Sequence, residues 1–134
     1  MNRPPINGIE CIKVFKDIKV VMTIHLELYR YGSKVDIPPN IGIFDECSYW
    51  IHTHDEPGVI YVESPVVRSF RLGDFFDIWG VEISSTSFMG EPVTPDKPLY
   101  IYVDETVYNG DPRDIVLRDG MKIVISYGGP INNP

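Results

Sequence analysis

Apolar and polar residues alternate along several short stretches of the chain, a pattern typical of β-strands with one buried face. In residues 22–29, one face carries Met22, Ile24, Leu26 and Leu28, and the other carries Thr23, His25, Glu27 and Tyr29. Gly32 and Ser33 then form a turn, and residues 34–38 return as a second strand that ends at Pro38 and Pro39. The pattern predicts a first hairpin over this region.

A second hairpin is predicted over residues 49–63, because two alternating segments flank the turn dipeptide Pro57-Gly58. Residues 67–72 are expected to form a further strand after Pro65. The next segment changes period and predicts a helix of about two turns that docks its apolar stripe on a sheet. The stripe consists of Leu72, Phe75, Phe76 and Trp79, with Asp74 near the start and Gly80 at the end.

The last third of the chain returns to strand-like patterns, and residues 99–128 predict three strands separated by Asn-Gly-Asp-Pro and Asp-Gly turns. We therefore expect an all-β, mainly antiparallel fold: a β-sandwich or open barrel of about seven to eight strands with one short helix. No repeat or change in composition divides the chain. Residues 1–134 are read as a single domain with an N-terminal arm at 1–8 and a C-terminal tail at 129–134.

Charge and hydropathy narrow the classes of partner. The 134-residue chain has a formal net charge of −7, which disfavours binding to the phosphate backbone of nucleic acids. No apolar run approaches the length of a membrane span, and no leader peptide is recognisable at the N-terminus. The sequence as read predicts a soluble, acidic, cytoplasmic protein with no nucleic-acid or membrane partner, and leaves an extracytoplasmic location open.

The two cysteines, Cys11 and Cys47, allow three interpretations. Buried reduced thiols are the favoured one, because cysteine is among the most buried residue types. A disulfide would stabilise the fold by roughly 3–4 kcal/mol in the chain-entropy model. Ligation of a metal by one cysteine is the third.

The second hairpin holds the main candidate for a functional site. His52 and His54 are two residues apart in a strand, so they share a face and their β-carbons lie roughly 7 Å apart. Parity places Trp50 and Glu63 on that face as well, and His25 occupies the matching face of the first hairpin. If the hairpins lie side by side, the three histidines converge, with Glu63 or Asp55 in support. Such a set suits zinc or copper.

Several alternatives remain for this face. In the plainest one, the histidines are hairpin residues hydrogen-bonded to Asp55 and Glu63. In another, an aromatic surface binds a protein or small molecule without chemistry, or buries itself in a homo-oligomer; its members would be Trp50, Tyr29, Tyr61, Tyr100 and Tyr102. An open metal site would favour metal-activated water and hydrolysis. Enzymatic activity is therefore left open.

Four segments together resemble a family of small, uncharacterised prokaryotic β proteins with no established function. These are residues 8–11, 24–43, 47–65 and 70–80, and the resemblance recurs at 107–117. The family pattern Cys-x-Tyr-x-x-His-Thr-His-Asp matches residues 47–55, and its Glu-Ser-Pro and Phe-Phe-x-x-Trp-Gly elements match 63–65 and 75–80. The resemblance supports the residues Cys47, His52, His54, Asp55, Glu63, Phe75, Phe76 and Trp79. It also implies further family histidines where this chain has Val21, Thr23 and Tyr61.

Overall fold

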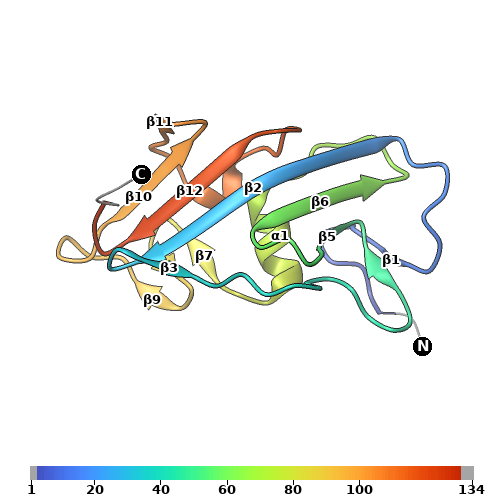
Figure 1. The fold of residues 1–134 in the computed structure, drawn as a ribbon, viewed down its shortest axis with the longest axis horizontal. Helices are drawn as coiled ribbons and strands as arrows, with labels where there is room; N and C mark the ends of the chain where they lie inside the picture. The colour runs from blue at the N-terminus through green and yellow to red at the C-terminus, as the bar shows by residue number, and fades with distance from the viewer. Residues whose placement is uncertain (1–2, 131–134) are drawn as a thin grey trace.

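The computed structural model describes residues 3–130 and has an all-β fold with one α-helix, as predicted (Figure 1). The strands of the main sheet are β2 (Val20–Arg30), β3 (Ser33–Val35), β5 (Ile51–Thr53), β6 (Val59–Ser64), β10 (Leu99–Val103), β11 (Thr106–Val107) and β12 (Lys122–Tyr127). The strands of two small sheets are β1 (Cys11–Ile12) with β4 (Ser48–Tyr49), and β7 (Ile83–Ser84), β8 (Ser87–Phe88) and β9 (Glu91–Pro92). The helices are α1 (Leu72–Trp79) and the 3-10 helix η1 (Pro112–Asp114).

The main sheet is open and mixed, with the strand order β11-β10-β12-β2-β6-β5. The long strand β2 pairs in parallel with β12 on one side. Its other side pairs with β6 over residues 20–25 and with β3 over residues 28–30, both antiparallel. The predicted hairpins are therefore confirmed as β2–β3 and β5–β6. Of the three predicted C-terminal strands, the first is confirmed as β10 and β11 and the last as β12. The middle one is wrong, because the segment between the two turns holds η1 and only an isolated bridge at Val116. The parallel pairing of β12 with β2 was not predicted.

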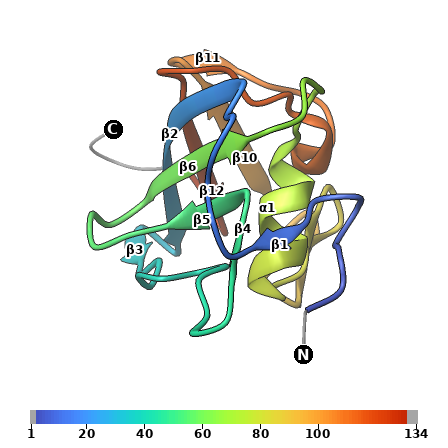
Figure 2. The same cartoon turned by 90° about the vertical axis from the view of Figure 1, so that its right-hand side faces the viewer.

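Helix α1 covers one face of this sheet, and the core lies between them (Figures 1 and 2). The strand alternation was predicted correctly, since Ile24, Leu26 and Leu28 of β2 are buried and face the helix side. The helix contributes Leu72, Phe75, Phe76 and Ile78 to the core. It begins where the Asp74 carboxylate accepts a hydrogen bond from the Arg71 backbone N–H, and it ends at Gly80 in the left-handed conformation. We call the opposite face of the sheet the outer face.

Two further local predictions are wrong. Residues 67–72 form no strand, because Arg71 already precedes the first turn of α1 and makes only an isolated bridge with Val116. Trp50 does not lie beside the histidines: the chain bends between β4 and β5, and the Trp50 ring packs edge-on against Phe70 in the core. The proposed aromatic surface therefore lacks its tryptophan.

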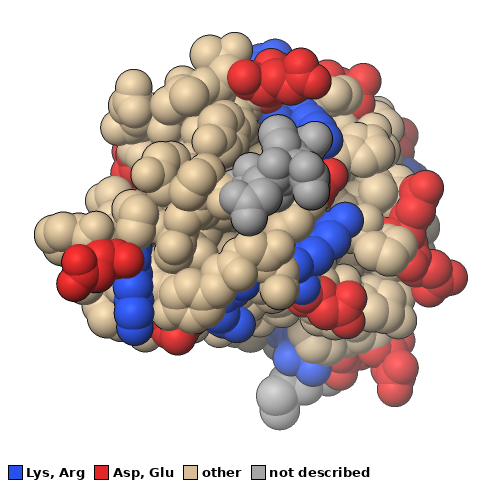
Figure 3. Space-filling model, turned by 60° about the vertical axis from the view of Figure 1, so that its left-hand side comes forward, with Lys and Arg blue, Asp and Glu red and all other residues tan. Residues whose placement is uncertain are grey.

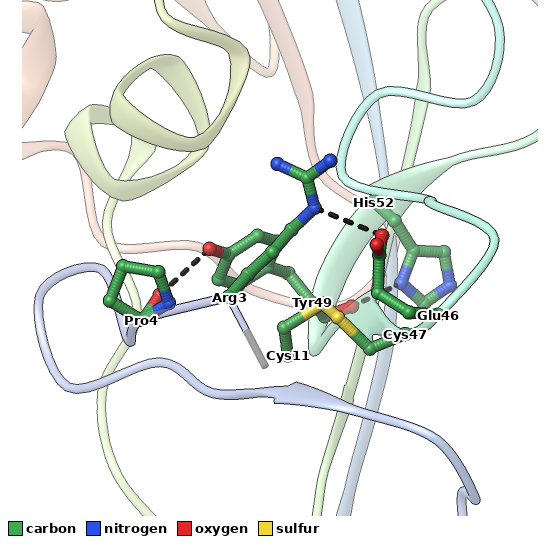
Figure 4. The surroundings of a disulfide bond; sticks show 7 residues. All are labelled: Arg3, Pro4, Cys11, Glu46, Cys47, Tyr49 and His52. Atoms are coloured by element: carbon green, nitrogen blue, oxygen red, sulfur yellow. Dashed lines mark hydrogen bonds and ion pairs between the residues drawn. A yellow bond between two sulfur atoms is a disulfide. The ribbon is translucent and has the colours of Figure 1, made fainter. Parts of the chain in front are cut away.

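The cysteines form a disulfide, so the favoured prediction of reduced thiols is wrong. The bond joins Cys11 of β1 to Cys47, which directly precedes β4 (Figure 4). Cys11 also pairs with Tyr49 of β4. The described part of the N-terminal arm lies against the body of the protein, because the Tyr49 hydroxyl donates to the Pro4 carbonyl and Asn7 donates to two carboxylates of α1. In the predicted C-terminal tail, residues 131–134 lie outside the described residues.

Candidate metal site

The candidate site lies on the outer face of the β5–β6 hairpin. In this hairpin His52 pairs with Tyr61, so both side chains project from the same face. Glu63 lies two residues further along β6 and therefore projects on the same side. His54 directly follows β5. The ligand atoms of His52, His54 and Glu63 lie within 4.8 Å of one another, which makes this a group that could hold a metal ion.

His52 is held on both sides of its ring. Its Nδ1 atom lies 2.7 Å from the Tyr49 carbonyl oxygen and its Nε2 atom lies 2.9 Å from Oε1 of Glu63 (Figure 4 shows the first contact). A carbonyl oxygen can only accept, so Nδ1 carries the hydrogen and donates it. Nε2 and its lone pair are thereby directed at Glu63. A metal-bound histidine is commonly oriented by such a hydrogen bond from its other ring nitrogen.

Aromatic rings enclose His52. Its ring is stacked on Tyr61 with an interplanar angle of 15°, and Phe15 meets it edge-on with 5.6 Å between ring centroids. Phe15 belongs to the segment between β1 and β2, which passes across the β4–β5 end of the molecule in Figure 2. His52 is consequently only 2% exposed, although the Glu63 side chain is 36% exposed and His54 is exposed. His52 is therefore shielded from solvent, whereas His54 and Glu63 form the solvent-exposed side of the group.

His25 and Asp55 are not members of this group. Strand β6 lies between β2 and β5, and His25 pairs with Val59 of β6 rather than with a residue of β5. One strand therefore separates His25 from His54. Asp55 belongs to the exposed turn between β5 and β6. The assignment of His25 and Asp55 as ligands stays a prediction. The implication that related proteins carry histidines where this chain has Val21, Thr23 and Tyr61 also stays a prediction.

Sequence reasoning also missed the group that orients His52. The Tyr49 carbonyl is a backbone acceptor, so no side-chain pattern marks it. Phe15 is far from the hairpin in sequence and reaches His52 only because β1 is fixed to β4. The one signal available was the pair of cysteines, since Phe15 follows Cys11 by four residues and Tyr49 follows Cys47 by two.

Burial lowers the pKa of His52, while the Tyr49 carbonyl and the Glu63 charge oppose this shift and His54 adds to it. A histidine whose pKa is lower in the folded than in the unfolded protein stabilises the fold at high pH. That contribution is fully present above the ordinary histidine pKa of 6.5 and is lost as the pH falls through the folded value.

We therefore expect the free energy of unfolding to fall on acidification below this point in chelator-containing buffer. In a His52→Gln variant this part of the pH dependence should be missing. Urea unfolding at a series of pH values measures both curves. Parallel curves for the wild type and the variant would show that another group is responsible.

The chain matches no protein-family model, no curated protein and no solved structure in the three comparisons made. The resemblance described above therefore stays a prediction. Within residues 3–130 no helix has the length and apolar character needed to cross a membrane.

Proposed function

We propose that this is a metal-binding protein in which His52, His54 and Glu63 hold one zinc ion. The observation that carries the proposal is the placement of the His52 ring: Nδ1 lies 2.7 Å from the Tyr49 carbonyl oxygen, and Nε2 lies 2.9 Å from a carboxylate oxygen of Glu63. With Nδ1–H donated to Tyr49, Nε2 of the neutral ring and Oε1 of Glu63 are both acceptors and lie 2.9 Å apart. A divalent cation bound between them interacts favourably with both.

The donor set fits zinc. Two imidazoles and one carboxylate are a recognised set for zinc sites that keep a fourth position for water. Tetrahedral bonds of about 2.0–2.1 Å place ligand atoms about 3.3 Å apart, closer than the 4.8 Å limit within which these atoms lie. The exposed His54 side chain can rotate to close this gap, while His52 stays fixed by its backbone contact. Copper is the second metal that imidazole donors suit.

The fourth position would face solvent, since Glu63 and His54 form the open side of the group. A zinc-bound water at that position has a lowered pKa and can act as a nucleophile near neutral pH. Hydrolysis is therefore the reaction class that the site favours if the protein is an enzyme. The disulfide supports residence in an oxidising compartment, because such bonds are rare where thiols are kept reduced.

Calorimetric titration with zinc tests the proposal. We expect one ion per chain in the wild type and an affinity at least about tenfold lower in Glu63→Gln, which keeps the shape of the side chain but removes its charge. His25→Ala is the matched control, because His25 is exposed and outside the group. If His25→Ala weakens binding and Glu63→Gln does not, the zinc site is elsewhere.

A further inference from the structure

A cavity, separate from the candidate metal site, opens where the main sheet is interrupted. Strands β6 and β3 pair with the same side of β2. The pairing of β2 with β6 ends at His25, and its pairing with β3 begins only at Leu28. A cavity of about 280 Å³ lies at this gap, close to the lower end of small-molecule sites. It is lined by His25, Leu26, Glu27, Lys34, Val35, Asp36, Ile37, Pro57 and Gly58.

The cavity has an apolar floor and a charged rim. Leu26 and Ile37 are buried, and Val35 pairs with Leu28, so these residues belong to the core side of the sheet. Lys34 pairs with Tyr29 and thus projects from the outer face. Asp36 is two residues beyond Lys34, and His25 has the parity of the outer face.

Gly58 closes one wall and cannot be replaced by a larger residue without moving the wall. It has φ +74°, and an added β-carbon would lie 2.4 Å from the Leu26 carbonyl oxygen. The adjoining Leu26 N–H donates to the Gly58 carbonyl over 2.7 Å. The wall formed by the β5–β6 turn is therefore fixed against β2, and the cavity is a preformed feature of the fold.

The charges on the rim differ in how they are used. Glu27 is engaged, since it accepts a hydrogen bond from Tyr29 over 2.7 Å and lies 3.4 Å from the Lys122 ammonium. The pKa of Glu27 is lowered by the Tyr29 hydrogen bond and by the nearby Lys122 and Lys34 charges. Within residues 3–130, the side chains of His25, Lys34 and Asp36 make no hydrogen bond or ion pair of their own. One cation, one anion and one imidazole thus remain available at the rim.

We propose that this cavity binds a free aliphatic α-amino acid. Lys34 and His25 meet the carboxylate, Asp36 accepts from the ammonium group, and the aliphatic side chain lies on Leu26, Val35 and Ile37. A zwitterion balances the opposite charges of Lys34 and Asp36, whereas a simple anion or cation would leave one of them facing a like charge. A metal ion is a poor fit, because His25, Glu27 and Asp36 form no group of converging ligand atoms in the described chain.

The test is a titration of ¹⁵N-labelled protein with leucine, followed by amide chemical shifts. EDTA is included so that chelation of a metal ion by leucine plays no part, which keeps this proposal independent of the zinc site. We expect saturable shifts at Val35 and Gly58 with a dissociation constant of about 1 mM or lower. 4-Methylpentanoate and isoamylamine each lack one charge and should bind at least about tenfold more weakly.

Two variants and their controls complete the experiment. Lys34→Gln and Asp36→Asn should each weaken leucine binding at least about tenfold, because each removes one of the two rim charges that make no ion pair within the described part of the chain. Lys13→Gln and Asp96→Asn change exposed residues outside the cavity and should leave it unaltered. The proposal is overturned by shifts that do not saturate or that map elsewhere. Equal binding of the single-charge compounds, or of Lys34→Gln, would overturn it as well.

Discussion

Replacing His52 with alanine is expected to lower zinc affinity at least about 100-fold, equivalent to about 2.7 kcal/mol. His52 is the only member of the group that is both buried and fixed by a backbone contact. His54 and Glu63 alone would have to be ordered by the metal itself, at a cost in side-chain entropy. Competition with a chromophoric chelator measures the loss.

The same change should also destabilise the protein without metal. The Tyr49 carbonyl loses its donor and the space beside Phe15 and Tyr61 is left empty, which together cost about 2–4 kcal/mol. His54→Ala is the matched comparison, because His54 is exposed and its loss should weaken zinc binding with little change in stability. If His54→Ala and His52→Ala lower the free energy of unfolding equally, the buried His52 ring does not stabilise the fold through its contacts with Tyr49, Phe15 and Tyr61.

Replacing both cysteines with serine is expected to lower the free energy of unfolding by about 3–4 kcal/mol. The disulfide joins residues 36 positions apart, and the chain-entropy model assigns this stabilisation to a loop of that length. Urea unfolding of the double variant and the wild type measures the difference. The wild type in strong reductant should fall to the level of the variant, and the variant should not respond to reductant.

Zinc affinity should fall about tenfold in the same double variant. Tyr49 follows Cys47 by two residues and pairs with Cys11, so the disulfide fixes the strand whose carbonyl orients His52 (Figure 4). Phe15 lies four residues beyond Cys11 and loses its anchor as well. Groups that orient a metal ligand typically contribute 10–100-fold to affinity.

Serine does not bind zinc as thiolate does, so the double variant is a cleaner test than reduction of the wild type. Unchanged zinc affinity would show that the paired strands β1 and β4 keep their positions without the disulfide.

The alternation and helical spacing of apolar residues predicted the strands, the helix and their buried faces correctly where each element stays regular. Alternation in β2 identified the buried row, and parity correctly placed His52 beside Tyr61 and Glu63, because a strand has a fixed period of two. The stripe of α1 was also readable, since its aromatic residues recur at helical spacing.

Features that depend on distant parts of the chain were not predictable. The order of strands places β6 between β2 and β5, which separates His25 from the other histidines, and no local pattern encodes that order. The bend that turns Trp50 into the core breaks the parity rule because β4 and β5 belong to different sheets. The disulfide likewise depends on β1 and β4 meeting, so composition alone favoured the wrong redox state.

The net negative charge of the chain disfavours a polyanionic partner. The net charge is −7, and on the face drawn in Figure 3 Lys and Arg side chains are interspersed with Asp and Glu. The prediction that the protein does not bind nucleic acid stays a prediction. A filter-binding assay at low salt, where electrostatic binding is strongest, would test it.

Native mass spectrometry of the zinc-loaded protein is the most direct test of the proposed metal site. The wild type should carry one zinc ion per chain after removal of excess metal, and the His52→Ala plus His54→Ala variant should carry none. The disulfide, which adds a mass difference of its own on reduction, can be checked in the same spectra. A wild type that retains no zinc, or a double variant that retains as much as the wild type, would contradict a zinc site at His52, His54 and Glu63.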